Sequence, residues 1–180
     1  MKKIKWSAFL LVLLLFVSTV ACTGNGGAEQ YSQEIADVEL KHWGSAPNFV
    51  VLDEQGKAVQ LSDFAGKPVV LNFWATWCGY CKLEMPDFDK AYAQYPDVVF
   101  LMINATDGVY ETKEKASAYV KSEGFSFDVY YDVSGLAQNA YQLTGYPTTV
   151  FIDANGDVVS KEVGMISYET LVEGLKLITD

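Results

Sequence analysis

Arginine is absent from this chain of 180 residues, and histidine occurs once. All 13 basic residues are therefore Lys, against 23 acidic residues, and the formal net charge is −10. A chain without a guanidinium group and with this negative charge repels polynucleotides, which excludes nucleic acid as an expected partner. The three Cys are too few for a fully paired disulfide scaffold, and with one distant His they make a poor zinc site. We therefore expect no metal and no cofactor.

Long apolar runs are also missing. The longest covers residues 8–17, about half of the ~20 residues that a membrane-spanning helix needs. It follows a basic start and precedes Ala21 and Cys22, which resembles a bacterial lipoprotein signal peptide, although Thr19 stands where Leu is usual. We predict a signal peptide over 1–21, a lipidated Cys22, and an extracytoplasmic protein anchored to the cell membrane of a bacterium. Cleavage removes three Lys and no acidic residue, so the net charge changes from −10 to −13.

Residues 22–45 are predicted to be a flexible tether. The stretch 23–27 is Gly-rich and offers no side chain that could build a core. Residues 28–40 fit either one weak helix, from the spacing of Tyr31, Ile35 and Val38, or an acidic spacer. His42, the single His, is expected to be a surface residue.

What the chain does have is core-forming material, since 50% of its residues are hydrophobic and 14% are aromatic. Its length indicates one domain, placed at 46–180. The pattern favours an α/β fold with a mixed central sheet, an N-terminal β-hairpin and helices on both faces. Strands are predicted at 49–52, 58–61, 68–74, 98–103, 128–131, 148–152 and 158–163, and helices at 79–95, 111–123, 134–141 and 167–178.

Cys78 and Cys81 are separated by two residues and lie between a predicted buried strand and a predicted helix. Residues i and i+3 in a first helical turn can bring their Cα atoms to the ~5.5 Å that a disulfide requires. The unpaired N–H groups of a helix start stabilise a thiolate, so Cys78 is the expected nucleophile and Cys81 the resolving thiol. An inert staple is the alternative, but a disulfide across so short a loop constrains little chain entropy.

Three segments of the chain resemble one family. They are 46–49 (APNF), 66–86 (GKPVVLNFWATWCGYCKLEMP) and 145–149 (GYPTT), and together they are similar to the thioredoxin-like lipoproteins and membrane-tethered proteins of the TlpA/ResA family. The resemblance implies a thioredoxin fold, an extracytoplasmic position, and thiol–disulfide exchange fed by a polytopic membrane electron donor.

The resemblance also assigns residues to a site. Pro147 would be the cis-proline that faces the dithiol, and Tyr146 and Thr148 beside it would meet the substrate chain, together with Trp77, Gly79 and Tyr80. Trp74 is expected in the core. Glu84 falls where the family keeps an acidic residue beside the dithiol, and a solvated helix Glu is the alternative. Asn72 occupies the position of a buried Asp in cytosolic thioredoxins, so Glu84 inherits any proton transfer.

The leading hypothesis is a membrane-anchored protein disulfide reductase. Its clients would be disulfide-containing proteins, with apocytochrome c and a methionine sulfoxide reductase both compatible with the family. A lipid-anchored thiol oxidant and a non-enzymatic ligand-binding lipoprotein remain as alternatives. The Gly79-Tyr80 dipeptide differs from the Pro-containing pairs common in the family, which leaves the redox potential open.

Overall fold

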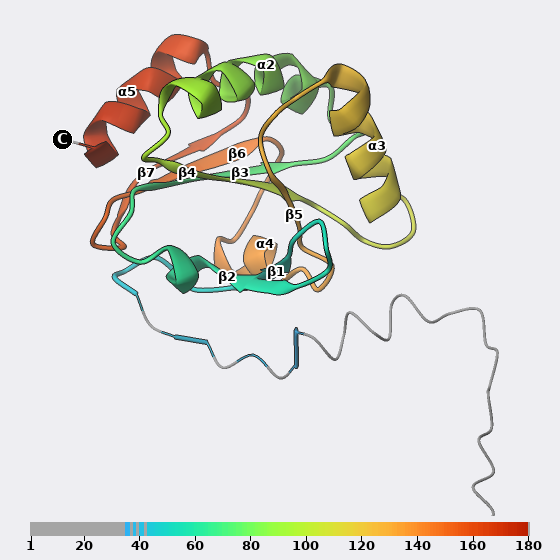
Figure 1. Ribbon diagram of the computed structural model, residues 1–180, viewed down its shortest axis with the longest axis horizontal. Helices are drawn as coiled ribbons and strands as arrows, with labels where there is room; N and C mark the ends of the chain where they lie inside the picture. Colours follow the sequence, from blue (N-terminus) through green and yellow to red (C-terminus); the bar gives the residue numbers. More distant parts are fainter. Residues whose placement is uncertain (1–34, 37, 39, 42, 180) are drawn as a thin grey trace, which may run out of the picture.

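A mixed sheet of seven strands is the centre of the structure, a computed structural model that describes residues 35, 36, 38, 40, 41 and 43–179 (Figure 1). The strand order is β2-β1-β5-β4-β3-β6-β7. The strands are β1 (Val50–Leu52), β2 (Ala58–Gln60), β3 (Val69–Trp74), β4 (Val99–Asn104), β5 (Val129–Tyr131), β6 (Thr148–Ile152) and β7 (Val158–Val163). The helices are the 3-10 helix η1 (Leu61–Phe64), α2 (Gly79–Gln94), α3 (Lys113–Glu123), α4 (Leu136–Ala140) and α5 (Tyr168–Thr179).

The central strand β3 is buried along its whole length. It pairs in parallel with β4 and antiparallel with β6. Its side chains alternate between two apolar clusters, with Val70 and Trp74 in one and Leu71 and Phe73 in the other. A strand buried on both faces needs a nearly continuous apolar sequence, which is why this run was recognisable.

The helices cover both faces of the sheet, as predicted. In Figure 1, α2, α3 and α5 lie on one side and α4 and η1 lie on the other. The first cluster includes Met85 of α2, Val120 of α3 and Leu175 of α5, whereas the second includes Ala137 of α4 and Leu61 of η1. The expected mixed sheet with helices on both faces is confirmed.

Both predicted hairpins, β1–β2 and β6–β7, are present and use the same turn chemistry. The Oδ1 atom of Asp53 accepts hydrogen bonds from the N–H groups two and four residues later, and Asp153 does the same. The third residue after each Asp is a glycine with positive φ, Gly56 at 80° and Gly156 at 85°. Glycine, which has no Cβ, is favoured in that backbone region. The sequence of each turn therefore encodes its conformation locally.

One helix starts later than predicted. We expected a helix from Glu111, but α3 begins at Lys113, because the Thr112 hydroxyl caps it by accepting a hydrogen bond from the N–H of Lys115. Glu111 therefore stands outside the helix, and its side chain is fully buried. The other predicted elements agree with the structure to within about two residues, the uncertainty of any helix or strand boundary.

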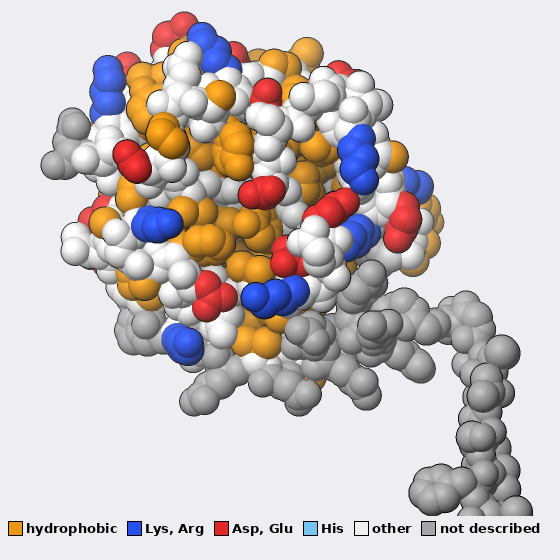
Figure 2. All heavy atoms as spheres, in the orientation of Figure 1, with side chains coloured by type: hydrophobic (Ala, Val, Ile, Leu, Met, Phe, Trp, Pro, Cys, Tyr) orange, Lys and Arg blue, Asp and Glu red, His pale blue; other side chains and the backbone are white. Residues whose placement is uncertain are grey.

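One face of the molecule carries an apolar hollow. Hydrophobic side chains gather in the middle of the face shown in Figure 2, with charged side chains around them. A hollow of about 370 Å³ is lined by residues of η1, α2, β4 and β5, among them Phe64, Tyr92, Phe100 and Tyr130. Neither cysteine, nor either residue between them, lines this hollow.

Of the residues predicted to precede the domain, only 35, 36, 38, 40, 41 and 43–45 are described. The predicted signal peptide (1–21), the predicted lipidation site Cys22 and His42 lie outside the described residues. Among the residues that are described, no helix is long and apolar enough to cross a bilayer.

Candidate functional site

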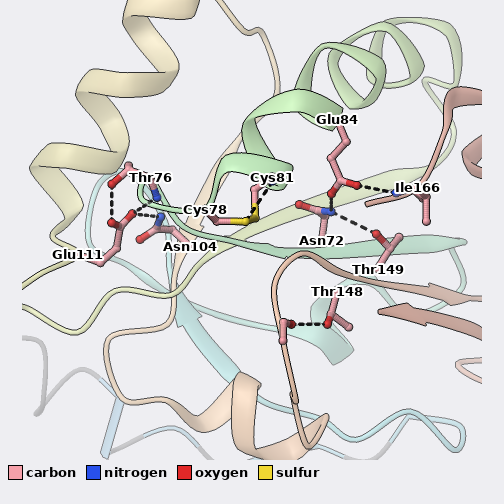
Figure 3. Close-up of a disulfide and its surroundings, with 11 residues drawn as sticks. Asn72, Thr76, Cys78, Cys81, Glu84, Asn104, Glu111, Thr148, Thr149 and Ile166 are labelled. Atoms are coloured by element: carbon pink, nitrogen blue, oxygen red, sulfur yellow. Dashed lines mark hydrogen bonds between the residues drawn. A yellow bond between two sulfur atoms is a disulfide. The ribbon is translucent and has the colours of Figure 1, made fainter. Parts of the chain in front are cut away.

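Cys78 and Cys81 form a disulfide at the start of α2 (Figure 3). Their Cα atoms lie 5.3 Å apart, close to the separation expected from the sequence. Cys78 is the N-cap residue, and its Sγ accepts a hydrogen bond from the N–H of Cys81 at 3.1 Å. Cys78 retains 6% exposure and Cys81 none. Cys78 is thus the more accessible of the two residues and lies at the positive end of the helix dipole.

The loop before β6 comes to the dithiol through sheet pairing. Phe73 of β3 is opposite Thr148 of β6, so the preceding residue, Pro147, lies at the end of β3 from which the chain leads to Cys78. The Tyr146–Pro147 peptide bond is cis, as the resemblance implies. Proline has no N–H, so it offers no backbone donor at this point, and its carbonyl oxygen accepts a hydrogen bond from the N–H of Gly164 at 2.8 Å.

Aromatic side chains surround the dithiol on the solvent side. Trp77 is 60% exposed and Tyr80 is 65% exposed. The rings of Trp77 and Tyr146 meet edge to face, with their centroids 5.5 Å apart. Gly79 is exposed, and a Cβ added there would meet no atom within 4 Å, so the backbone is open to an approaching chain. Trp74, in contrast, is fully buried, as predicted.

Thr148 is placed differently from the other residues of the expected substrate surface. Its side chain is fully buried, and its hydroxyl donates a hydrogen bond of 2.7 Å to the carbonyl oxygen of Gly145 (Figure 3). The hydroxyl is thus used to fix the loop that carries Pro147. The sequence places Thr148 correctly beside the site, but its side chain does not reach the surface.

Glu84 lies on α2 one turn after Cys81 and is only 1% exposed, so the alternative of a solvated helix Glu is wrong. Its Oε1 accepts a hydrogen bond from the Asn72 side-chain amide at 2.8 Å, and its Oε2 accepts one from the N–H of Ile166 at 3.0 Å (Figure 3). Burial raises the pKa of Glu84 to about 7, with a smaller contribution from the charge of Asp87, while the two hydrogen bonds act in the opposite direction.

Asn72 connects Glu84 to the sheet. Its side-chain nitrogen also donates to the hydroxyl of Thr149 at 3.2 Å, whereas its Oδ1 is buried and has no hydrogen-bond partner. A buried polar atom without a partner is unusual and costs about 1–3 kcal/mol. Glu84 and Asn72 therefore form a buried pair in which one acceptor remains unused.

Glu111 is a second buried carboxylate, which the sequence analysis did not identify. Its Oε1 accepts from the N–H of Thr76 at 2.8 Å and from the amide of Asn104 at 2.6 Å, and its Oε2 accepts from the Thr76 hydroxyl at 2.6 Å. Figure 3 shows this group on one side of the disulfide and the group of Glu84 on the other. The only hint in the sequence was an acidic residue shortly after the end of a buried strand.

The arrangement can perform dithiol–disulfide exchange. It combines a partly accessible sulfur at a helix start, a buried partner sulfur, a cis-proline opposite them and a buried carboxyl group that titrates near neutral pH. No cluster of potential metal ligands occurs within the described residues.

Comparisons with known proteins agree with this chemistry. The model of the AhpC/TSA family matches residues 44–161. The thiol-disulfide oxidoreductase ResA of Bacillus cereus is 36% identical to this chain over 174 residues, which cover 95% of each protein. The thioredoxin-like protein YneN of Bacillus subtilis is 29% identical over 173 residues, which cover 96% of this chain and 98% of YneN. Among solved structures, the exposed lipoprotein thioredoxin Etrx1 of Streptococcus pneumoniae superimposes with a TM-score of 0.64 at 30% identity, over 72% of this chain and 98% of Etrx1.

The disulfide at the start of α2, the thioredoxin fold and these relatives lead to one conclusion. The chain belongs to the AhpC/TSA family and, within it, is a thioredoxin-like thiol–disulfide oxidoreductase of the TlpA/ResA group.

Proposed function

We propose that this protein is a membrane-anchored reductant of protein disulfides on the outer side of the cell membrane. The observation that carries the proposal is the pairing of a helix-start Cys78 with a fully buried Cys81 and a buried Glu84 one turn further along α2. The two sulfurs differ in access, and the second one has a carboxyl group in its vicinity that can take up a proton.

The exchange has two steps. The thiolate of Cys78 attacks one sulfur of the client disulfide, a mixed disulfide forms, and the released client sulfur leaves as a thiolate that takes up a proton. Cys81 then loses its proton and attacks Cys78, which forms the Cys78–Cys81 disulfide and releases the second client thiol. Two electrons pass from the dithiol to the client, and a membrane electron donor restores the dithiol.

Glu84 is the proposed proton acceptor for Cys81. With its pKa raised to about 7 by burial, the carboxyl group is divided between its two forms near neutral pH and can both accept and return a proton. Asn72 has no ionisable side chain and cannot replace it. The negative form of Glu84 opposes a neighbouring thiolate, which favours the oxidised dithiol and lowers its reduction potential.

The client chain would lie across the surface formed by Trp77, Tyr80 and the loop before β6. Trp77, Gly79 and Tyr80 offer an open, aromatic surface, and the backbone at Tyr146 can pair with an extended segment of the client. Pro147 has no N–H group that could compete for the carbonyl groups of the client. The hydrogen bond from Thr148 to Gly145 holds the loop in position. Apocytochrome c and a methionine sulfoxide reductase remain compatible clients.

The proposed location rests on the leader and on the relatives. The basic start, the apolar run and Ala21 before Cys22 favour lipidation of Cys22, and the solved relative Etrx1 is described as an exposed lipoprotein. Cys22→Ser should leave the chain unprocessed or release it from membranes. An intact mass of the wild-type protein that still includes Met1 would contradict this location.

The trapping of a mixed disulfide tests the proposed mechanism. Cys81→Ser should accumulate a client bound to Cys78, because the resolving step is removed, whereas Cys78→Ser should abolish reduction and trap nothing. Peptide mapping of the trapped complex identifies the bonded cysteine. A client found on Cys81 in the Cys78→Ser variant would reverse the assignment.

A further inference from the structure

The loop between β4 and α3 exposes two adjacent large apolar side chains. Val109 is 72% exposed and Tyr110 is 78% exposed. Single exposed apolar residues are common on protein surfaces, but two together in a short loop leave an unusual amount of apolar area in water. Neither residue is part of the dithiol chemistry described above.

The loop is fixed in this exposed arrangement. The Oδ1 atom of Asp107 accepts hydrogen bonds from the N–H groups of Val109, Tyr110 and Glu111, at 2.7, 2.7 and 2.9 Å. The Lys115 ammonium group donates to the carbonyl oxygen of Tyr110 at 2.7 Å. With its backbone held at both ends, the loop presents its two apolar side chains to solvent in a fixed position.

The same loop is joined to the segment that carries the dithiol. Glu111 follows Tyr110 directly, and its carboxylate accepts hydrogen bonds from both the N–H and the hydroxyl of Thr76. Thr76 is two residues before Cys78, and Figure 3 shows Glu111, Thr76 and Cys78 in sequence along one side of the site. The two exposed side chains thus belong to a loop that is anchored beside the reactive sulfur.

We propose that Val109 and Tyr110 form an accessory docking surface for clients, which takes up large apolar side chains next to the client's reactive cysteine. The inference rests on the proposed function, because a client must approach Cys78 before a mixed disulfide can form. Trp77, Tyr80 and Leu83 (67% exposed) are exposed apolar side chains next to Cys78 and Cys81 in the chain, and Glu111 ties the loop to Thr76, the residue directly before Trp77. The occupant is therefore an extended, disulfide-bearing polypeptide with apolar residues flanking its cysteine.

The test compares two disulfide-linked peptides of equal length, in which the residues flanking cysteine are either Leu or Ser. Glutathione disulfide serves as the small reference substrate. The full-length chain, purified in detergent and reduced, is mixed with each, and the second-order rate constant of dithiol oxidation is measured. The test variant carries Val109→Ser with Tyr110→Ser. The matched control carries Val159→Ser with Leu177→Ser, which are exposed apolar residues of β7 and α5 (41% and 63%).

For the test variant we expect the rate with the Leu peptide, relative to glutathione disulfide, to fall about tenfold, the scale on which a few interface residues act. The same ratio for the Ser peptide, and both ratios for the control variant, should change less than twofold. An unchanged Leu-peptide ratio, or equal losses for the two peptides, would overturn the docking surface. A wild-type chain that reduces none of the three disulfides would instead refute the proposed function itself.

Discussion

Two buried glutamates lie on opposite sides of the dithiol, and their surroundings differ. Glu111 is fully buried and accepts three hydrogen bonds, from the N–H and hydroxyl of Thr76 and from the amide of Asn104. Glu84 is 1% exposed and accepts two, from the amide of Asn72 and the N–H of Ile166. The residue type and the exposed fraction are nearly the same, whereas the hydrogen-bond donors differ.

Glu111 connects segments of the backbone. Two of its three donors are on Thr76, in the loop that leads to the dithiol, so its carboxylate fixes that loop to the chain after β4. Glu84 has fewer donors, and burial raises its pKa to about 7. Glu111 thus supports the structure of the loop before the dithiol, whereas the raised pKa of Glu84 lets its carboxyl group exchange a proton near neutral pH.

Removal of the Glu111 side chain should cause the largest loss of unfolding free energy. Glu111→Ala leaves the Thr76 N–H and the Asn104 amide without their acceptor, and each buried donor left without a partner costs about 1–3 kcal/mol. Urea unfolding of the full-length chain measures the change in unfolding free energy. Glu173→Ala, at an exposed position of α5, is the control and should stay within about 0.5 kcal/mol of the wild type. Equal stability losses in the two variants would refute the structural role of Glu111.

Glu84→Gln should change the unfolding free energy less than Glu111→Ala does, and at high pH it should raise this free energy rather than lower it. The pKa of Glu84 rises from 4.5 to about 7 on folding, so the stability that its proton contributes is complete below about pH 4.5 and is lost as the pH rises through 7. The difference between these pKa values corresponds to at most about 3 kcal/mol. The unfolding free energy of the variant should therefore rise relative to that of the wild type between pH 5 and pH 8, because the Gln amide needs no proton. If the Asn72 side-chain amide rotates by a half-turn, the Gln amide can also donate a hydrogen bond to the Asn72 Oδ1 atom, which has no partner in the wild type.

Unfolding curves at several pH values distinguish the outcomes for this variant. The stability difference should be close to zero at the acidic end and largest at pH 8. The same variant should lose the pH dependence near 7 of the step that releases the client, if Glu84 takes the proton of Cys81. A stability difference that does not change with pH would contradict the proposed titration of Glu84.

Thr149→Val should cause the smallest change in unfolding free energy of the three substitutions. The Thr149 hydroxyl accepts one hydrogen bond from Asn72, at 3.2 Å, and is not among the hydrogen-bond partners of the Glu84 carboxyl group. Loss of one such neutral contact costs about 1 kcal/mol, and the pH dependence of stability should be retained. Urea unfolding at pH 5 and pH 8 checks both points. A change as large as that of Glu111→Ala would mean that Asn72, and not the carboxylates, organises the site.

The part of the site that lies within one local segment could be read from the sequence. The spacing of Cys78 and Cys81 after a buried strand predicted the disulfide, and the Gly-Tyr-Pro pattern at 145–147 matched a family in which the proline is cis. The two hairpin turns were equally local, because an Asp and a Gly at fixed spacing encode them.

The contacts that join distant segments could not be read in this way. Glu111 reaches Thr76 across 35 residues, and the N–H of Ile166 reaches Glu84 across 82. Nothing in the spacing of such residues shows that they meet, because sheet pairing brings them together. The burial of Glu84, and hence its raised pKa, was in the same way a consequence of packing that the sequence left open.

The reductive direction is tested most directly by the midpoint potential of the Cys78–Cys81 pair. The full-length chain in detergent is equilibrated with defined ratios of reduced and oxidised dithiothreitol or glutathione, and its reduced fraction is determined by thiol alkylation and mass measurement. A buried Glu84 beside the dithiol and the absence of Arg from the chain both disfavour a stable thiolate, so we predict a potential below about −200 mV. A value near about −120 mV, typical of strong thiol oxidants, would contradict the proposal and make the protein an oxidant.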